Sequence, residues 1–355
     1  MRYVLIGDGE SPHLLKWAKA LAAAPGIELW AASSRGFLPG FDSLLPPARR
    51  LALATRPAAA GGNAALLWHL PRMARWLRHV NPAWIHAHYL TSHGTLAWLA
   101  KKLFGVPGGL VGSAWGSDIL VTPGRSALLR ALTRRVLRAC TLTTSDSQAM
   151  ARAMRALGAR EVMVFPFGLE ALPPPGAAKD DALWFANRGL EPLYRPQQVI
   201  ELFAAAAPPL ARLVIANDGS LRATLERQVE QQGLGGRVRF VGRLDAGTQA
   251  GWYDRARWYL SLPASDSVAV SVLEAMAHGC IPVLSDLPAN RELVRDGDNG
   301  LIVADPPALD AARLRGMLER ADRVAEDNRA WVREHALFGP CVQAFLNRLA
   351  ALPSA

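Results

Sequence analysis

Short apolar runs of strand-like composition alternate with amphipathic helical patterns along nearly the whole chain of 355 residues. Such alternation predicts parallel sheets whose strands are joined by crossover helices. In the first half, strands are expected at 3–6, 27–32, 84–87, 109–113 and 141–144. In the second half, they are expected at 183–186, 212–216, 238–241, 258–262, 281–284 and 301–303. Because the chain is long enough for two ordinary domains, the pattern predicts two doubly wound α/β domains.

A segment rich in proline and small residues, 169–181, separates the two series of expected strands. This composition is typical of a linker. The chain is therefore expected to divide into a first domain at 1–168, a second domain at 182–337, and a final helical segment at 338–355.

The most informative short segment is 265–279, in which seven residues separate Asp266 from Glu274. A loop of small residues follows Asp266, and a helix-forming run carries Glu274. The unpaired N–H groups at a helix start suit a phosphate, and the helix dipole adds positive potential there. A carboxylate one turn further along can accept hydrogen bonds from ribose hydroxyls. The segment therefore predicts recognition of a nucleoside diphosphate.

This segment resembles the donor-binding motif of retaining GT-B glycosyltransferases of the family 4-like group, which includes bacterial polysaccharide and lipid-glycan synthases. The family pattern is Glu, seven residues, Glu and then Ala-Met-Ala-x-Gly, and this chain has Asp266 at the first position. The resemblance implies the GT-B fold: two Rossmann-like domains facing a cleft. The domain at 1–168 would bind the acceptor and the domain at 182–337 the nucleotide sugar. The helix at 338–355 would pack back on the first domain.

Further motifs of the second half match the family in order and spacing. The resemblance implies that Arg188 and Arg195 hold the diphosphate, with Arg195 replacing the commoner Lys, and that Asp266 acts as a catalytic residue near the transferred sugar. Asn217 stands where the family has the first Gly of a Gly-x-Gly turn. The donor-binding residues implied in this way are Arg188, Arg195, Asp218, Gly219, Gly242, Arg243, Ser267, Val268, Ala269, Val270 and Glu274.

The first half matches the family more loosely. His88 ends an expected strand, and because similar proteins carry a functional His there, it is the leading catalytic candidate. Asp118 lies in the loop after the next strand and is expected to orient His88 or to contact an acceptor hydroxyl. His86 and His93 are expected to be structural. The residues expected on the acceptor side are Gly7, Gly9, Glu10 and Trp115.

Positive charge is concentrated in the first half. Residues 1–170 contain 20 Lys and Arg against 8 Asp and Glu, a net charge of +12, whereas residues 171–355 contain 20 against 22. The first half is therefore expected to face an anionic partner. Anionic membrane lipid and a phosphorylated acceptor are the candidates. Nucleic acid is not expected, because no groove-reading helix or aromatic-lined sheet accompanies the charge.

Two helical runs carry much of this charge, at 66–80 and 126–139. Each places arginines opposite an apolar stripe, which is typical of interfacial helices and equally of a solvated face above a core stripe. The stripe of the first run is expected to contain Leu66, Leu70, Met73 and Leu77, with Trp68 and Trp76 outside it. The stripe of the second is expected to contain Leu128, Leu129, Leu132 and Val136.

Neither a metal nor another cofactor is expected. The cysteines at 140, 280 and 341 share no metal-ligand spacing, which also fits a reducing cytoplasm. Asp296-Gly297-Asp298 could be a metal-binding Asp-x-Asp, but its Gly and Asn content favours a turn. No run approaches the roughly 20 apolar residues of a spanning helix, and no leader is evident. A cytoplasmic location at the inner face of the membrane is therefore expected.

The resemblance implies a retaining, metal-independent hexosyltransferase. It would move a sugar from a nucleotide-diphosphate donor to a hydroxyl of a glycan or lipid-linked acceptor, in cell-surface polysaccharide or glycolipid synthesis. Two alternatives stay open on the same fold. One is a nucleotide-sugar 2-epimerase, and the other is a catalytically silent, donor-sensing subunit of a polysaccharide assembly complex.

Overall fold

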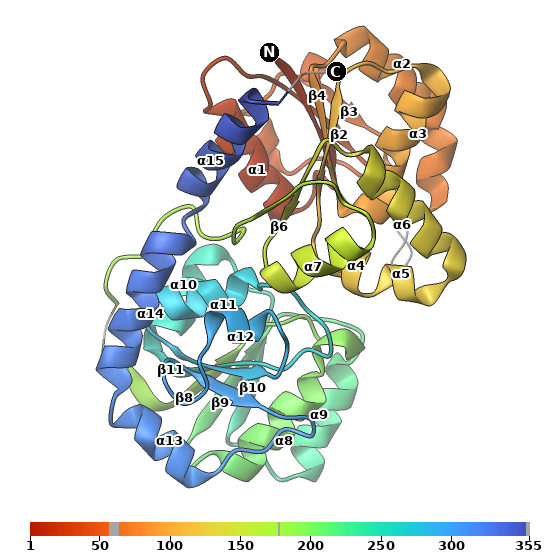
Figure 1. Cartoon of the computed structure of the whole chain (residues 1–355). Helices are drawn as coiled ribbons and strands as arrows, with labels where there is room; N and C mark the ends of the chain where they lie inside the picture. The colour runs from red at the N-terminus through yellow and green to blue at the C-terminus, as the bar shows by residue number, and fades with distance from the viewer. Residues whose placement is uncertain (57–63, 177, 353–355) are drawn as a thin grey trace. The chain divides into compact units, whose positions relative to one another are not determined.

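The structure is a computed structural model that describes residues 1–56, 64–176 and 178–352. It contains two compact units, one formed by residues 1–165 with 339–355 and the other by residues 166–338. Each unit holds one parallel sheet with helices on its faces (Figure 1). The expected pair of doubly wound, Rossmann-like sheets is therefore confirmed.

The sheet of the first unit has seven strands in the order β3-β2-β1-β4-β5-β6-β7. Their bounds are Arg2–Gly7 for β1, Glu28–Ser33 for β2, Arg50–Ala52 for β3, Trp84–His88 for β4, Gly109–Ser113 for β5, Leu142–Ser145 for β6 and Val162–Val164 for β7. The short edge strands β3 and β7 were not expected.

The helices of the first unit are α1 (Pro12–Ala22), α2 (Leu70–Val80), α3 (Thr95–Phe104), α4 (Ser117–Leu120), α5 (Thr122–Arg125), α6 (Ala127–Ala139), α7 (Gln148–Ala156) and α15 (Phe338–Ala350). The helix α15, drawn in blue in Figure 1, comes from the end of the chain but packs within this unit. The ring of Phe345 lies 5.5 Å from that of Trp17, and Arg348 forms an ion pair of 2.5 Å with Glu161.

The sheet of the second unit has six strands in the order β10-β9-β8-β11-β12-β13. Their bounds are Asp180–Ala186 for β8, Arg212–Ala216 for β9, Val238–Gly242 for β10, Ala256–Ser261 for β11, Ile281–Ser285 for β12 and Leu301–Val303 for β13. Its helices are α8 (Pro196–Ala206), α9 (Arg222–Gln231), α10 (Ala246–Arg255), α11 (Val270–Ala277), α12 (Asn290–Leu293), α13 (Ala311–Leu318) and α14 (Ala321–His335).

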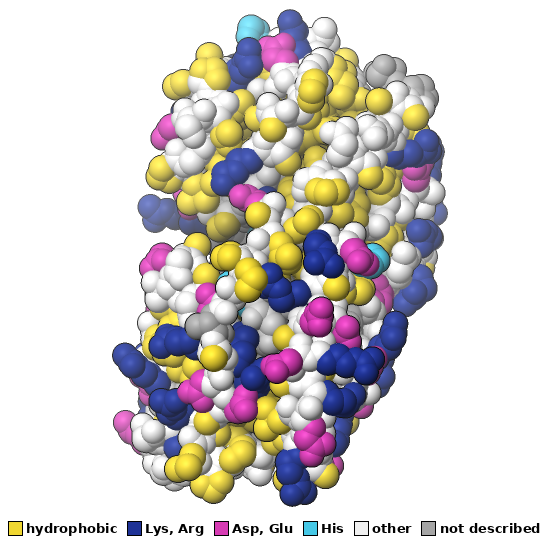
Figure 2. Space-filling model, turned by 90° about the vertical axis from the view of Figure 1, so that its left-hand side faces the viewer, with side chains coloured by type: hydrophobic (Ala, Val, Ile, Leu, Met, Phe, Trp, Pro, Cys, Tyr) yellow, Lys and Arg dark blue, Asp and Glu magenta, His cyan; other side chains and the backbone are white. Residues whose placement is uncertain are grey.

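The second sheet is buried on both faces. Side chains alternate between the faces of a strand, so Trp184 packs in one apolar cluster with Phe203 and Trp258. Phe185 points to the other face and packs with Tyr253. Strands covered on both sides read as continuous apolar runs, which is why the sequence predicted them well. Over the second unit, in the lower part of Figure 2, acidic and basic side chains are interspersed.

Two side chains of the basic helical runs depart from expectation. Leu128, expected in the apolar stripe of α6, is 75% exposed. The buried residues of α6 are Thr133, Val136 and Leu137, so Leu128 lies outside the buried face of this helix. Trp76 was expected outside the stripe of α2 but packs against the core, with its ring 6.0 Å from Trp30.

Other features of this unit agree with expectation. Leu66, Leu70, Met73 and Leu77 are buried, and Trp68 is 87% exposed. Across the described residues, no helix has the length and apolar character needed to cross a bilayer.

Candidate active site

The residues expected to bind the donor follow the carboxyl ends of four strands in the second unit. Arg188 comes after β8, the turn 217–219 after β9, and Arg243 directly after β10. The loop 266–269 connects β11 to α11. These strands are parallel neighbours, so their carboxyl ends meet at one edge of the sheet, where ligands of doubly wound folds bind.

Arg188 and Asp266 form an ion pair at this edge. Arg188 Nη2 lies 2.5 Å from Asp266 Oδ2, and Nη1 donates to Ser271 Oγ at 3.2 Å. The guanidinium also lies 4.5 Å from the ring centroid of Tyr194. Its buried Nε has no hydrogen-bond partner among the described residues. At least one N–H donor of the cation is thus unused within the described residues.

The environment of Asp266 is largely desolvated. Burial raises the pKa of its carboxyl above the ordinary value, while the Arg188 cation acts in the opposite direction. Oδ1 accepts the backbone N–H of Ser267 at 3.0 Å. Both carboxylate oxygens therefore have partners, Oδ2 in Arg188 after β8 and Oδ1 in the backbone of the loop that precedes α11.

Glu274 lies in α11, one turn after its first residue, and is held by a network of polar side chains. Its Oε2 accepts from the Tyr253 hydroxyl at 3.0 Å and from Gln249 Nε2 at 3.2 Å. Asn187 Nδ2 donates to the same hydroxyl at 2.7 Å, and Asn187 Oδ1 accepts from Tyr259 at 2.8 Å. Burial, Tyr259 and Glu274 raise the pKa of Tyr253 well above its usual value, so its hydroxyl stays protonated as a donor.

The sequence did not point to Asn187, Gln249 or Tyr253. For Asn187, a signal was available in the sequence, because this polar residue lies between an apolar strand and Arg188. Nothing local indicates Gln249 or Tyr253, because their contact with Glu274 joins segments more than 20 residues apart.

The turn after β9 explains why a glycine is commoner at position 217. Asn217 has a φ of +81°, a region that glycine adopts freely and that Asn tolerates better than other side chains. Its side chain donates to the carbonyl oxygen of Asn187 at 3.3 Å. At Gly219, a Cβ atom would lie 2.5 Å from the carbonyl oxygen of Leu190, so this position accepts no side chain. The substitution at 217 is therefore compatible with the turn.

The remaining expected donor residues are arranged less uniformly. Arg195 precedes α8, and its Nη1 bonds Asp305 Oδ2 at 2.6 Å and Gln198 Oε1 at 3.2 Å. Its role in binding a diphosphate stays a prediction, since this nitrogen is already bound. Gly242 has a φ of +71° with open space around it. Five other positions complete the set: Asp218 and Arg243 are exposed, Val268 and Ala269 are buried, and Val270, the first residue of α11, is half-buried.

In the first unit, His88 lies at the carboxyl end of β4 and is 1% exposed. Its Nδ1 accepts the indole N–H of Trp115 at 3.2 Å, and its Nε2 has no partner among the described residues. Burial lowers its pKa well below the ordinary value, and His86, His93 and His13 act in the same direction. His88 is therefore a neutral imidazole with one unused nitrogen.

The neighbouring histidines differ from each other. His86 has partners on both ring nitrogens, Tyr3 at 2.8 Å and Ser113 at 2.6 Å, as expected of a structural residue. Burial lowers its pKa to about 3. His93 bonds the carbonyl oxygen of His88 at 2.8 Å through Nδ1, but its Nε2 has no partner in the described part of the chain. A second unused imidazole nitrogen thus lies close to His88.

Aromatic rings surround the end of β4. The ring of Trp115 stacks at 5.9 Å from that of Tyr89 and lies 4.8 Å from that of His13. Tyr89 has a φ of +61°, which is strained for a residue with a side chain and typical of functional sites.

Asp118 acts on this region through the backbone. Its Oδ1 accepts the N–H of Trp115 at 2.9 Å, and its Oδ2 accepts the N–H of Leu90 at 2.8 Å. Its hydrogen bonds fix the loops after β4 and β5, and through Trp115 they connect to His88. Burial raises the pKa of its carboxyl, and these hydrogen bonds act against the shift.

The Gly-rich loop after β1 is fastened to the loop after β2. A Cβ at Gly9 would lie 2.5 Å from the carbonyl oxygen of Gly36, so the close approach requires glycine. The Gly9 N–H donates to Ser33 Oγ at 2.8 Å. Glu10 forms an ion pair of 2.6 Å with Arg35, so its carboxylate is partly neutralised. A Cβ at Gly7 would similarly meet Leu14 at 2.5 Å.

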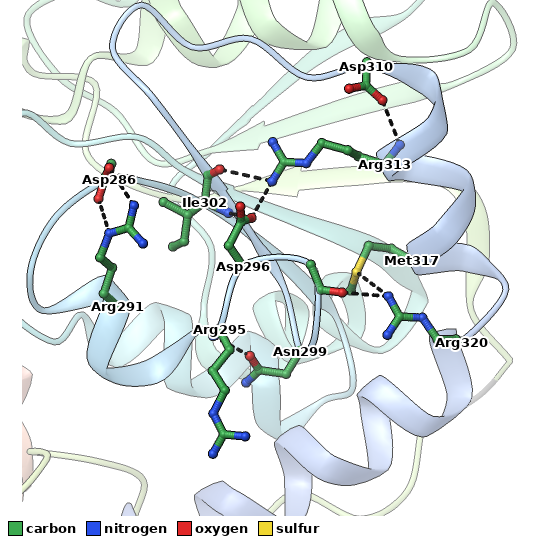
Figure 3. A network of polar contacts seen from close by, with 11 residues as sticks. Asp286, Arg291, Arg295, Asp296, Asn299, Ile302, Asp310, Arg313, Met317 and Arg320 are labelled. Carbon is green, nitrogen blue, oxygen red and sulfur yellow. Dashed lines mark hydrogen bonds and ion pairs between the residues drawn. The ribbon is translucent and has the colours of Figure 1, made fainter.

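Residues 297–299 form a turn after Asp296, which Figure 3 shows with its partner Arg313. The Gly297 N–H donates to the carbonyl oxygen of Gly300 at 2.9 Å. Asp296 Oδ1 accepts the N–H of Ile302 at 2.8 Å and forms an ion pair with Arg313. The turn prediction is therefore confirmed. Within the described residues, no group of three or more His, Cys, Asp or Glu side chains is arranged to hold a metal ion.

Two doubly wound sheets with polar residues gathered at their carboxyl ends define a two-domain α/β protein of the Rossmann-like class. Residues 172–331 match the family described as glycosyl transferases group 1, and residues 3–147 match the glycosyl transferase 4-like family. The chain belongs to the GT-B glycosyltransferases.

Curated relatives share parts of this sequence. The phosphatidyl-myo-inositol mannosyltransferase of Mycolicibacterium smegmatis is 40% identical over 93 residues, which cover 25% of this chain and 24% of that protein. The N-acetyl-alpha-D-glucosaminyl L-malate synthase of Bacillus anthracis is 24% identical over 245 residues, covering 65% and 64% of the two chains. The matched region thus spans about a quarter of the first relative and less than two thirds of the second.

Solved structures resemble this one over their whole length. Anabaena HepE, in complex with UDP and glucose, has a TM-score of 0.78 at 16% identity, covering 99% of this chain and 100% of that chain. Sucrose-phosphate synthase from Thermosynechococcus elongatus has a TM-score of 0.77 at 15% identity, covering 99% of each chain. At this level of identity, the likeness establishes the fold alone.

Proposed function

We propose that this protein is a retaining, metal-independent hexosyltransferase. It transfers a sugar from a nucleoside-diphosphate donor to a hydroxyl of a glycan or lipid-linked acceptor, in cell-surface polysaccharide or glycolipid synthesis. The observation that carries the proposal is the gathering of Arg188, Asp266 and Glu274 around the start of α11, at the carboxyl edge of the second sheet. The UDP named with the HepE structure supports a nucleotide-sugar donor.

In this proposal, the donor diphosphate lies between Arg188 and the start of α11. The guanidinium and the helix N–H groups stabilise negative charge as it develops on the departing phosphate. Cationic and dipolar groups of the protein can thereby do the work that a divalent cation does elsewhere. Glu274 holds the ribose, with Oε2 fixed by Tyr253 and Gln249.

Within this proposal, the use of the carboxylates bears on the route by which the anomeric configuration is retained. Both oxygens of Asp266 and Oε2 of Glu274 are already hydrogen-bonded within the protein. This favours a same-face displacement over a covalent sugar–enzyme adduct. The departing phosphate then helps to deprotonate the acceptor hydroxyl, and the unused Nε2 of His88 donates to a substrate oxygen.

A lipid-linked acceptor at the inner, cytoplasmic face of the membrane suits the basic first unit. Trp68 is 87% exposed beside the arginines of α2, and Leu128 is 75% exposed among those of α6. A cavity of about 450 Å³ next to α6 has Arg130 and Arg134 at its edge and is otherwise lined mostly by apolar residues. The name of the mycobacterial relative includes a phospholipid, phosphatidyl-myo-inositol.

The test is a panel of UDP- and GDP-sugars incubated with glycan and lipid-linked acceptors in excess chelator. We expect nucleoside diphosphate to be released only when an acceptor is present. NMR should show that the new linkage has the same anomeric configuration, axial or equatorial, as the donor. Formation of an epimeric nucleotide sugar without acceptor would identify an epimerase. Tight donor binding without turnover on any acceptor would favour a silent subunit. Activity that is lost in chelator and restored by magnesium or manganese would contradict metal independence.

A further inference from the structure

A cavity of about 600 Å³ lies in the second unit, at the edge of the sheet opposite the candidate donor site. Its wall includes Asp180 and Arg212, the first residues of β8 and β9, and Val238, the first residue of β10. Because the three strands are parallel, these amino ends lie at the other edge from Arg188 and the turn at 217–219. The cavity is therefore separate from the site assigned to the donor.

One side of the cavity is apolar. Leu183 and Val214 contribute to it from β8 and β9, and Trp252 from α10. The ring of Trp252 has two neighbours: Phe185 stacks at 6.3 Å between centroids, and the guanidinium of Arg255 lies 4.0 Å from the indole centroid. This wall can accept a flat organic group.

The rest of the lining is strongly basic. It contains four arginines and a single carboxylate, a net charge of +3. Arg212 is paired with Asp180 at 2.6 Å, and Arg237 donates to backbone carbonyl oxygens such as that of Pro208, at 2.8 Å. The other two arginines, Arg239 and Arg255, form no ion pair within the described residues.

Unpaired donors supplement these cations. Arg239 is exposed, and its side chain has no hydrogen bond to any described residue. The loop before β10 adds Gly235 and Gly236, and neither backbone N–H donates to another group in the part of the chain that the structure describes. A Cβ atom at either glycine would meet nothing within 4 Å, so a ligand can approach the backbone closely. Guanidinium and consecutive amide groups are typical partners of a phosphate.

We propose that this cavity binds a phosphorylated small molecule, independently of the donor. Arg239 and Arg255, with the amides of Gly235 and Gly236, hold the phosphate, and the organic part lies against Trp252. The volume falls in the range of small-molecule sites, roughly 300–1,000 Å³. The proposal goes beyond the transferase activity, since no residue of this cavity belongs to the candidate active site.

Phenyl phosphate is a suitable probe, because it joins a phosphate to a flat apolar ring. Binding to the full chain is measured by ligand-observed NMR and calorimetry, with inorganic phosphate and UDP alongside. Phenyl phosphate is expected to bind more tightly than inorganic phosphate and to stay bound in excess UDP. Arg239→Glu should weaken it at least about tenfold, as loss of a charge-assisted contact and introduction of repulsion require.

Matched variants distinguish binding at this cavity from a general effect of the protein's net charge. Arg315→Glu makes the same charge change at an exposed arginine of α13 and should leave binding unchanged. Trp252→Leu should weaken phenyl phosphate while sparing inorganic phosphate, with melting temperatures confirming that each variant is folded. The proposal is overturned if phenyl phosphate does not bind at millimolar concentration, if UDP displaces it, or if Arg239→Glu and Arg315→Glu behave alike. Failure to bind UDP would count only against the transferase proposal.

Discussion

The indole N–H of Trp115 donates to Nδ1 of His88 over 3.2 Å. A nitrogen that accepts a hydrogen bond carries no proton, so the proton of the neutral imidazole resides on Nε2. That nitrogen is buried and without a partner among the described residues. Trp115 thus prepares His88 as a hydrogen-bond donor rather than a base.

In Trp115→Phe, His88 should therefore no longer be restricted to one tautomer, because the hydrogen bond to Nδ1 is lost. We expect a mixture of Nδ1–H and Nε2–H forms by nitrogen NMR, and a fall in kcat of roughly tenfold with nucleotide affinity unchanged, since one oriented hydrogen bond is lost. Trp331→Phe, in α14 of the second unit, is the control. His88→Ala should fold, bind nucleotide and lose most turnover, and in that background Trp115→Phe should have no further effect. An unchanged tautomer in Trp115→Phe would contradict the assignment.

The ion pair of Arg188 with Asp266 predicts that one substitution tightens nucleotide binding and lowers turnover. Asp266→Asn removes a negative charge next to the expected diphosphate, so nucleoside diphosphates should bind about three- to tenfold more tightly by calorimetry. Turnover should fall, because the carboxylate is expected near the transferred sugar. Weaker nucleotide binding would mean that Asp266 mainly holds Arg188 in place.

Arg195 offers a parallel experiment, since Asp305 holds it as Asp266 holds Arg188. If Arg195 moves to the diphosphate on binding, Asp305→Asn should also tighten nucleotide binding, by about twofold or more, because the arginine no longer has to leave a carboxylate. Identical affinities in Asp305→Asn and the parent would remove Arg195 from the donor site.

Glu274 and Tyr253, which donates to it, predict a larger and a smaller loss of nucleotide affinity. Glu274→Ala should weaken binding of donor and free nucleotide by roughly 1.5–3 kcal/mol, the range for hydrogen bonds to a charged group. Tyr253→Phe leaves the carboxylate but removes a donor to Oε2, so a smaller loss of about 1 kcal/mol is expected. Glu230→Ala, at an exposed position in α9, is the control. Equal nucleotide affinity in Glu274→Ala and the parent would refute the ribose contact.

How well a feature of the site could be predicted depended on how far apart its residues lie in the sequence. Asp266 and Glu274 were identifiable as candidates because a helix start, which is expected to bind phosphate, and its carboxylate lie within one short segment. The ion pair of Arg188 with Asp266 joins residues 78 positions apart, so only the fold reveals it. The bond between Trp115 and His88 spans 27 positions and was equally hidden. For Leu128, helical periodicity indicated a stripe, but its exact direction depends on which neighbours α6 packs against.

Acid should destabilise the fold before its carboxylates titrate. Burial lowers the pKa of His86 to about 3 and that of His93 to about 4, and it lowers that of His88 as well. In the unfolded chain these groups take up protons near pH 6.5. As the pH falls below that value, the unfolded state binds more protons than the folded state, and stability is lost.

The expected slope is as much as about 1.4 kcal/mol per pH unit for each buried histidine. Urea unfolding between about pH 7 and pH 5 measures it. His93→Gln should reduce the slope, whereas His79→Gln, at an exposed position, should not. A free energy of unfolding that stays constant over this range would show that the three imidazoles are accessible to protons in the folded state.

The basic face of α6 predicts salt-sensitive binding to anionic vesicles. Replacing Arg130, Arg134 and Arg138 by Glu should release the protein, because each basic side chain near such a surface contributes about 1 kcal/mol and salt screens the attraction. Nucleotide binding should be unchanged, since these residues lie in the first unit. The same reversal at Arg227, Arg315 and Arg333, exposed in the second unit, controls for net charge. Sedimentation with phosphatidylglycerol vesicles across a salt series decides the matter. If the parent ignores these vesicles even at low salt, the charge serves a phosphorylated acceptor in solution instead.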